Sequence, residues 1–291
     1  MPLNMETLYE SQLEFLLTAG YGFVSKVFCD IVLSTEALMS KDNLRQYANL
    51  LSVILALAVN VLATALPLNN QTTAQISDRF KVYFVPAGYV FAIWGLIYIG
   101  WIAFVVYQFL PAHKESPRLR KLGYLFALTG IFNALWLFCW QYNHFTLSVI
   151  VMLILLGLLI ASYLNLNVGH TPVGAAEKWC VDISLSVYLG WISVATIANI
   201  ADWLYFVHWN GFGIDPQAWA VIMLLVATLL GLAMALTRRD SGYLFVFVWA
   251  FAGIAIKQSS APLVADSAWA AALIALAFAI YTIVQRQRAS V

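Results

Sequence analysis

The sequence predicts an all-α protein, a polytopic membrane helix bundle of about eight transmembrane helices. Of its 291 residues, 63% are hydrophobic and 10% are charged, and the mean hydropathy is +0.83. Ordinary soluble domains carry about 25% charged residues. Eight apolar stretches reach or approach the roughly 20 residues that a helix needs to cross a bilayer core of about 30 Å. Helices are expected because, inside lipid, each backbone polar group must be hydrogen-bonded within its own segment.

The first 45 residues differ from the rest of the chain. Apolar residues between Leu13 and Leu38 repeat with helical spacing, but charged residues such as Glu14 and Asp30 interrupt any run that could span a membrane. We interpret residues 1–45 as an amphipathic segment that lies on the membrane surface. Docking of this segment onto a partner subunit is the alternative.

The eight expected spans follow one another through short connections. They cover residues 46–66, 86–110, 122–141, 145–166, 179–207, 219–236, 242–257 and 267–284. The longest connection, 67–85, is polar, and loops of that length often cover a functional site. A second loop, rich in glycine and containing Pro216, predicts a boundary between a five-helix unit, 46–209, and three further helices, 210–291.

The basic residues predict how the chain crosses the membrane. If the eight helices alternate in direction, one side of the membrane receives most of them: Lys41, Arg45, Lys114, Arg118, Arg120, Lys121, Lys178, Arg238, Arg239, Arg286 and Arg288. The other side receives Arg79, Lys81 and Lys257. The positive-inside rule then places both termini in the cytoplasm, for a bacterial inner membrane or an equivalent one. The net charge of +1 predicts no nucleic-acid partner, and the spacing of the three cysteines predicts no metal site.

The fifth expected span carries polar side chains at membrane depth. Its residues 191–203 read W-I-S-V-A-T-I-A-N-I-A-D-W. At 3.6 residues per turn, one face of this helix holds Trp191, Ala195, Ala198, Asn199 and Asp202. The string therefore indicates a helix with a partly polar interior face.

Several other residues have structural roles as their simplest explanation. Tryptophans near the ends of the spans are expected to anchor the protein at the membrane interface: Trp101, Trp179, Trp209, Trp219 and Trp269. Asp202 lies close to the end of its span, where we expect water to solvate the carboxylate. Asp182 can pair with Lys178, four residues before it. Neither acid is a strong catalytic candidate.

Three of the spans share motifs with a known family. The second span begins P-A-G-Y-V-F-A-I-W-G-L-I-Y at Pro86, the third contains F-N-A-L-W at 132–136, and the fifth is the string above. These residues resemble the tryptophan-rich sensory protein or translocator-protein family (TspO/MBR). Its corresponding motifs read P-P-G-W-V-F-G-P-V-W-T-L-L-Y, L-N-x-x-W and W-x-S-F-A-T-x-L-N-x-x-x-W. The resemblance covers residues 46–209, and the second motif departs from the family at Ala87 and Tyr89.

The resemblance implies a five-helix bundle around a ligand pocket, roofed by the loop between the first two helices. The ligands that it implies are tetrapyrroles, sterols or synthetic aromatic compounds, and we favour a tetrapyrrole of porphyrin, haem or chlorophyll type. The candidate ligand-binding residues are Trp94, Tyr98, Asn133, Trp136, Trp191, Ala195 and Asn199. Flat macrocycles bind by stacking and apolar burial against rings. For Trp94, Trp136 and Trp191 the alternative is packing of the bundle, and for both asparagines it is hydrogen bonding between helices.

The leading hypothesis is a non-enzymatic membrane sensor, carrier or receptor, with lipids and a hydrophobic small molecule as partners. The family often has an acidic residue on its fourth helix, but residues 145–166 contain no carboxylate, which argues against porphyrin-modifying activity. An accessory subunit of a larger, pigment-binding membrane complex is the alternative, and a homodimer stays open. A secondary transporter ranks last, because the spans show no paired ionisable residues near the midplane.

Overall fold

The computed structural model describes residues 40–65 and 68–288. The chain divides into two compact units, Met1–Arg45 and Gln46–Val291. The expected amphipathic segment, 1–45, lies outside the described residues except for its last six. Within those six, the Asp42 carboxylate pairs with the Arg45 guanidinium at 3.1 Å. The second unit contains everything that follows.

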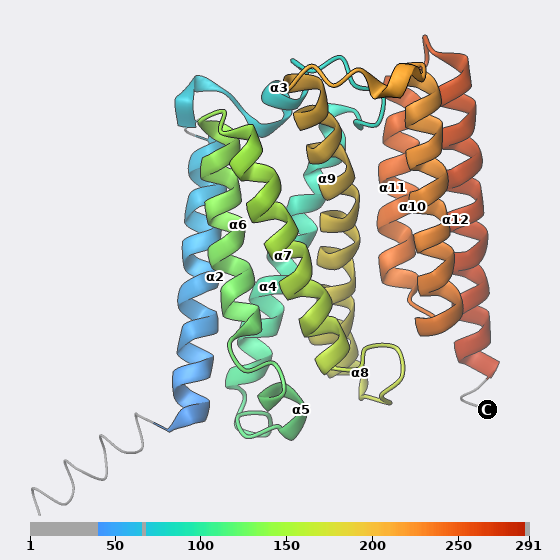
Figure 1. The fold of residues 1–291 in the computed structure, drawn as a ribbon. Helices are drawn as coiled ribbons and strands as arrows, with labels where there is room; N and C mark the ends of the chain where they lie inside the picture. Colours follow the sequence, from blue (N-terminus) through green and yellow to red (C-terminus); the bar gives the residue numbers. More distant parts are fainter. Residues whose placement is uncertain (1–39, 66–67, 289–291) are drawn as a thin grey trace, which may run out of the picture. The chain divides into compact units, whose positions relative to one another are not determined.

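The described part of the chain folds into long helices joined by turns and loops (Figure 1). They are α2 (Lys41–Ala65), α4 (Ile93–Phe109), α6 (Leu125–Gln141), α7 (Phe145–Asn165), α9 (Ser184–Phe206), α10 (Pro216–Arg238), α11 (Ser241–Lys257) and α12 (Pro262–Arg288). Among the described residues, six helices are long and apolar enough to cross a membrane, with α4 counted from Gly88 and α9 from Ala175, because helical turns precede them directly; α6 and α11 are apolar but shorter. A multi-pass, all-helical membrane protein is thus confirmed. The full number of eight spans stays a prediction.

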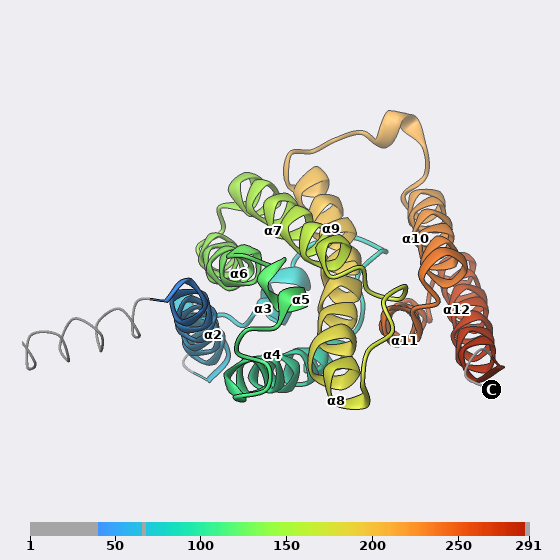
Figure 2. The same ribbon diagram turned by 90° about the horizontal axis from the view of Figure 1, so that it is seen from below.

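The helix α9 is the central element of the second unit. It packs against α4 and α7 on one side and against α11 on the other (Figure 2). In the most apolar window of Ala175–Phe206, the span that ends with α9, 78% of residues are buried, against 33–39% for the other long spans. One helix therefore connects the part of the bundle before residue 209 with the three helices that follow. The subdivision at residue 209 stays a prediction.

The short helix α3 (Thr73–Ser77) occupies the long connection between α2 and α4. Its first turn is fixed by a capping box. The Thr72 hydroxyl accepts a hydrogen bond from the Gln75 backbone N–H, and the Gln75 side chain accepts one from the Thr72 N–H. A loop that looked merely polar in the sequence thus contains an ordered helical turn at the end of the bundle.

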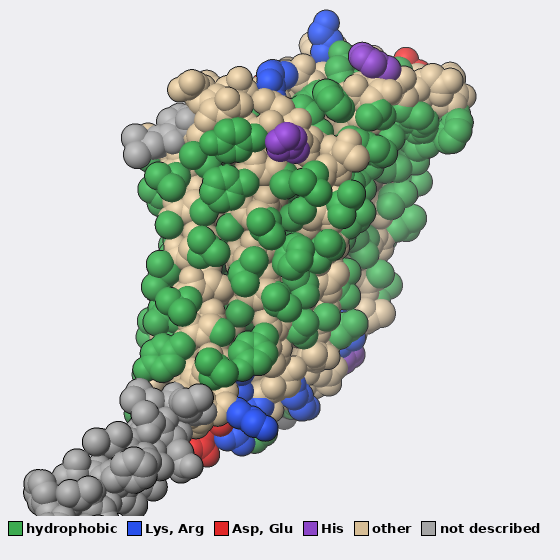
Figure 3. Space-filling view, turned by 60° about the vertical axis from the view of Figure 1, so that its left-hand side comes forward, with side chains coloured by type: hydrophobic (Ala, Val, Ile, Leu, Met, Phe, Trp, Pro, Cys, Tyr) green, Lys and Arg blue, Asp and Glu red, His purple; other side chains and the backbone are tan. Residues whose placement is uncertain are grey.

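Basic side chains lie at the ends of the bundle, and the surface between is hydrophobic (Figure 3). One end carries α5 (Pro117–Arg120), α8 (Ala175–Glu177) and the turn from α10 to α11 (Figure 1). The opposite end carries α3 and the loop after α9. By the positive-inside rule, the α5 end is predicted to face the cytoplasm.

Two sequence expectations about single residues are wrong. Asp182 does not pair with Lys178; its carboxylate lies 2.6 Å from the Arg118 guanidinium, which comes from the distant element α5. Trp101 is not an interfacial anchor, because only 2% of it is exposed and its ring packs 5.1 Å from that of Tyr188. The spacing along the helix suggested the first role and the nearness to the end of a span suggested the second. Tertiary packing overrides both.

Close packing of α6 against α2 depends on Gly130. A Cβ atom at this position would lie 2.8 Å from the Ser52 carbonyl oxygen of α2. Small residues allow such backbone approach between membrane helices. Gly130→Ala should therefore push the helices apart and lower the free energy of unfolding by about 1–3 kcal/mol. Thermal unfolding in detergent measures the effect.

The control for this prediction is Gly157→Ala in α7, where a Cβ atom would meet nothing within 4 Å. Alanine has the higher helix propensity, so Gly157→Ala should leave stability unchanged or raise it slightly. Equal effects of the two substitutions would contradict the role given to Gly130.

Candidate ligand-binding site

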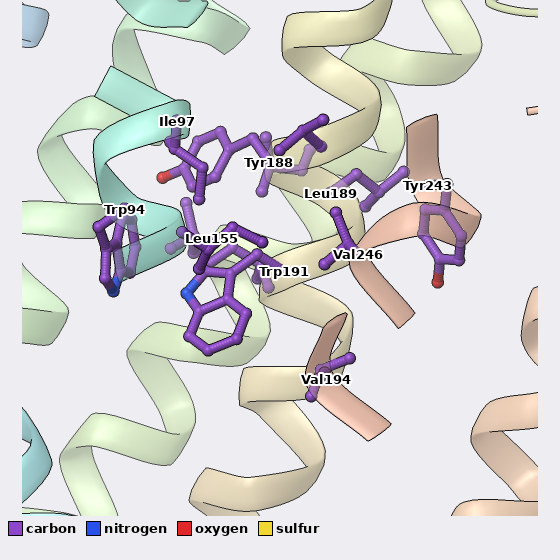
Figure 4. Close-up of a cluster of buried hydrophobic side chains, with 14 of the residues drawn as sticks. Trp94, Ile97, Leu155, Tyr188, Leu189, Trp191, Val194, Tyr243 and Val246 are labelled. Atoms are coloured by element: carbon purple, nitrogen blue, oxygen red, sulfur yellow. The ribbon is translucent and has the colours of Figure 1, made fainter. Parts of the chain in front are cut away.

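Aromatic rings from α4, α6 and α9 meet inside the bundle. The Trp94 ring lies 6.3 Å from Trp136, nearly parallel, and 6.3 Å from Trp191, edge to face. Trp136 in turn stacks on Trp140 at 6.0 Å. Figure 4 shows Trp94 beside α4 and Trp191 projecting from α9 toward α4, whereas Leu189 points toward α11. These separations are typical of favourable aromatic pairs.

A small cavity of about 30 Å³ lies against these rings and against α3. It is lined by Thr73, Ser77, Pro86, Phe91, Trp94, Trp136, Trp140, Trp191, Val194, Ala195, Ala198, Asn199 and Asp202. The face of α9 that the sequence singled out, with members three and four residues apart, supplies five of these residues. The helical period of residues 191–203 is thus what places them together.

Five of the seven candidate residues line this cavity: Trp94, Trp136, Trp191, Ala195 and Asn199. The other two, Tyr98 and Asn133, lie beside it in a hydrogen-bond network. The Tyr98 hydroxyl donates to Asn60 Oδ1 at 2.8 Å, and Asn60 Nδ2 donates to Asn133 Oδ1 at 2.8 Å. This network joins α4, α2 and α6. Asn60 was missed in the sequence, although an asparagine within the apolar run of the first span is itself a signal.

Asn199 is committed to protein partners. Its Oδ1 accepts a hydrogen bond from Trp136 Nε1 at 3.2 Å, and its Nδ2 donates to Ser148 Oγ at 3.0 Å. These bonds connect α9 with α6 and α7. Of the two roles left open by the sequence, the contacts favour hydrogen bonding between helices, which also fixes the orientation of the Trp136 ring.

Two polar atoms in the cavity wall have no hydrogen-bond partner among the described residues. They are Trp191 Nε1 and Asp202 Oδ1. Their side chains are almost wholly enclosed, with residue exposures of 2% and 1%. The expectation that water solvates Asp202 near the end of its span is therefore wrong.

The helix α3 closes one end of the cavity and is held by two neighbours. The Thr73 carbonyl accepts a hydrogen bond from Trp140 Nε1 at 3.3 Å, and the Thr73 hydroxyl accepts one from Gln141 Nε2 at 3.2 Å. On the other side, Asp78 pairs with Lys257 of α11. A roof over the pocket thus agrees with the arrangement expected for the loop 67–85.

A larger hollow lies on another face of α9. Its volume is about 450 Å³, and it lies between α9, the start of α10 and the chain after α3. It is lined by Lys81, Val82, Tyr83, Phe84, Ile197, Ile200, Ala201, Leu204, Tyr205, Trp209, Asn210, Gly211, Ile214, Pro216, Trp219, Ala220 and Met223. We call it the α9–α10 groove. Nothing in the sequence motifs pointed to it.

The two hollows differ in what they can hold. Small-molecule sites usually measure about 300–1,000 Å³, a range that includes the α9–α10 groove. The aromatic cavity, at about 30 Å³, has room for a water molecule or two. A larger ligand could enter it only if the rings or α3 moved.

Comparison with known proteins gives one match. A family model described as TSPO-like protein matches residues 46–281. The matched region continues past the fifth long helix and through most of α12. Searches of curated proteins and of solved structures found no match.

Proposed function

Because the chain belongs to the TSPO-like protein family, we propose that it binds a hydrophobic ligand, a tetrapyrrole, in the aromatic cavity. It would act as a sensor, carrier or receptor and not as an enzyme. The observation that carries this proposal is the cluster of four tryptophan rings that line one cavity beneath α3: Trp94, Trp136, Trp140 and Trp191. Rings of this size bury large apolar areas against a flat ligand.

The geometry suggests where the macrocycle would lie. Ala195 and Ala198 line the cavity beside Trp191, and their small side chains leave space along α9 that a leucine would fill. A ligand plane placed there would exchange ring-to-ring contacts within the protein for contacts with the macrocycle. The Trp94–Trp191 pair, which meets edge to face, would have to open for this exchange.

Binding also requires the cavity to grow. Hydrogen bonds from Trp140 and Gln141 to Thr73 hold α3 down, so displacement of Trp140 and of α3 would be linked. The ligand-free protein is then the closed form, and ligand affinity includes the cost of opening it. A slow association rate is expected for this reason.

The test is a titration of the protein in lipid nanodiscs with the dimethyl ester of a porphyrin, followed by quenching of tryptophan fluorescence. Trp191→Ala should weaken binding at least about tenfold, because it removes a buried aromatic wall. The matched control is Trp269→Ala, which removes an exposed tryptophan from α12 and should leave affinity unchanged. Equal affinities of wild type and Trp191→Ala would exclude the aromatic cavity as the site.

A second variant separates the two hollows. Ile200 lines the α9–α10 groove but not the aromatic cavity, so Ile200→Trp fills the groove and leaves the cavity wall in place. Porphyrin affinity should not change. Loss of binding in Ile200→Trp, with Trp191→Ala unaffected, would move the site to the groove.

A further inference from the structure

The wall of the aromatic cavity contains a carboxyl group, Asp202, with one oxygen that lacks a hydrogen-bond partner among the described residues. Asp202 is 1% exposed and lines the cavity, and its Oδ1 receives no hydrogen bond from any described residue. A buried carboxylate that lacks a partner is costly, so such groups are normally paired or hydrogen-bonded. Asp202 therefore has the properties of a group whose partner arrives from outside the protein.

The neighbouring polar groups do not provide that partner. The Asn199 amide, one turn before Asp202 on α9, is used by Trp136 and Ser148. Lys257 of α11 and Asp78 are paired with each other, so neither of them is the partner of Asp202. The lysine that could neutralise Asp202 thus holds down α3 instead.

The second unpartnered atom has the opposite chemistry. Trp191 Nε1 is a hydrogen-bond donor, and Trp191 lies eleven residues before Asp202, which is about 16 Å along the axis of α9. The cavity therefore offers a carboxyl oxygen as acceptor at the α3 end and a donor deeper in the bundle. Aromatic rings line the cavity between them.

We propose that Asp202 selects the ligand of this cavity by charge. It accepts a nitrogen-bound hydrogen, best from a protonated amine, and it rejects ligands that place a carboxylate at the α3 end. The proposal rests on the proposed function, because it concerns the same cavity. Among tetrapyrroles it favours those with esterified or amine-bearing side chains over free acids.

Two physical effects act in the same direction. A cation near tryptophan faces is attracted by the ring quadrupoles, and the attraction is stronger away from water. A ligand carboxylate beside Asp202 would place two carboxyl groups together in a largely enclosed site, where both can be ionised only against like-charge repulsion, which disfavours binding of the free acid. An uncharged ester avoids the repulsion and lacks the attraction, so its affinity should lie between the two.

The experiment compares three porphyrins with the same ring, whose side chains end in ammonium, methyl ester or carboxylate groups. Wild-type protein in uncharged-lipid nanodiscs should bind the ammonium form best and the free acid at least about tenfold more weakly. Asp202→Asn keeps the shape of the side chain and removes its charge, so the three affinities should become similar. An unchanged order of affinities in Asp202→Asn would overturn the proposal.

The control variant is Asp215→Asn. Asp215 is an exposed carboxylate at the same end of the bundle, where it caps α10, and asparagine caps helices equally well. The order of the three affinities should therefore stay as in wild type. If Asp215→Asn flattened that order as strongly as Asp202→Asn, selection would come from the general surface charge, and the assignment to Asp202 would be wrong.

The same series distinguishes failure of this inference from failure of the proposed function. Porphyrin binding that depends on Trp191 but not on Asp202 would overturn only the charge selection. If wild type bound no porphyrin, the proposed tetrapyrrole would be wrong. The same comparison would then use three naphthalene derivatives that carry the same ammonium, methyl ester and carboxylate groups. If wild type preferred the ammonium derivative and Asp202→Asn abolished that preference, the inference would be supported; if wild type showed no such preference, the inference would be wrong.

Discussion

Replacing Arg118 by methionine is expected to lower the free energy of unfolding by about 3–5 kcal/mol. The Arg118 guanidinium lies 2.7 Å from the Glu177 carboxylate and 2.6 Å from that of Asp182. It also donates two hydrogen bonds to the Leu166 carbonyl, at 3.1 and 2.9 Å. Methionine keeps much of the side-chain volume but leaves two largely enclosed carboxylates without their shared cation.

Arginine is well suited to this position. Burial alone lowers the pKa of the Arg118 guanidinium, but its hydrogen bonds to Glu177 and Asp182 and their negative charges raise that pKa above its ordinary value. The group therefore stays charged. Its planar fork can contact both acids and a carbonyl at once, which the single ammonium of lysine cannot reproduce. Arg118→Lys should recover part of the stability and not all of it.

Denaturant titration in detergent measures the loss, with Glu115→Gln as the control. Glu115 is exposed and lies 3.6 Å from Arg120, and exposed pairs of this kind contribute about 0–1 kcal/mol. Removing the charges of Glu177 and Asp182 together in the Arg118→Met background should restore stability, because no unpaired charge remains. A further loss in the triple variant would show that the cluster does not act as a charge network.

Asp240→Ala is expected to lower the free energy of unfolding by about 2–4 kcal/mol, through a lost helix cap and lost charge-assisted hydrogen bonds. Asp240 is buried at the start of α11, where its Oδ1 accepts from the Tyr243 N–H at 3.1 Å. Its Oδ2 accepts from the Tyr163 hydroxyl at 2.7 Å and from the Ser186 hydroxyl. One carboxylate thus joins α7, α9 and α11.

The matched comparison is Asp215→Ala. Asp215 is exposed and caps α10 through the N–H groups of Gln217 and Ala218, so its loss should cost only the cap, about 1 kcal/mol. The excess effect of Asp240→Ala over Asp215→Ala measures the bonds to Tyr163 and Ser186. Tyr163→Phe should account for part of that excess. If the two alanine variants were equally stable, those side-chain bonds would contribute nothing.

The sequence predicted the helical class and the positions of the long helices, because apolar run length is a strong signal in a membrane protein. It also predicted which face of α9 lines the cavity, since that follows from the helical period. It failed at Asp202, which lies near the end of a span. The sequence did not show that neighbouring elements enclose that end.

Other features depend on distant contacts that no local pattern contains. Arg118 was expected to signal topology, and its pairing with Asp182 becomes visible only when α5 meets the start of the fifth span. The small volume of the aromatic cavity results from how the rings of Trp94, Trp136 and Trp191 fill the space between helices. The α9–α10 groove requires the position of α10 against α9. Sequence motifs identify the residues that line a site, but they do not predict the volume of the cavity between those residues.

The two short helices have a consequence for the surrounding lipid. Both α6 and α11 contain 17 residues and are about 26 Å long at the usual helical rise, less than the roughly 30 Å of an average hydrocarbon core. If α6 and α11 cross the membrane as predicted, the bilayer beside α6 has to become thinner there, and each ångström of mismatch costs a fraction of a kcal/mol. On that prediction, bilayers of shorter acyl chains should fit this protein best.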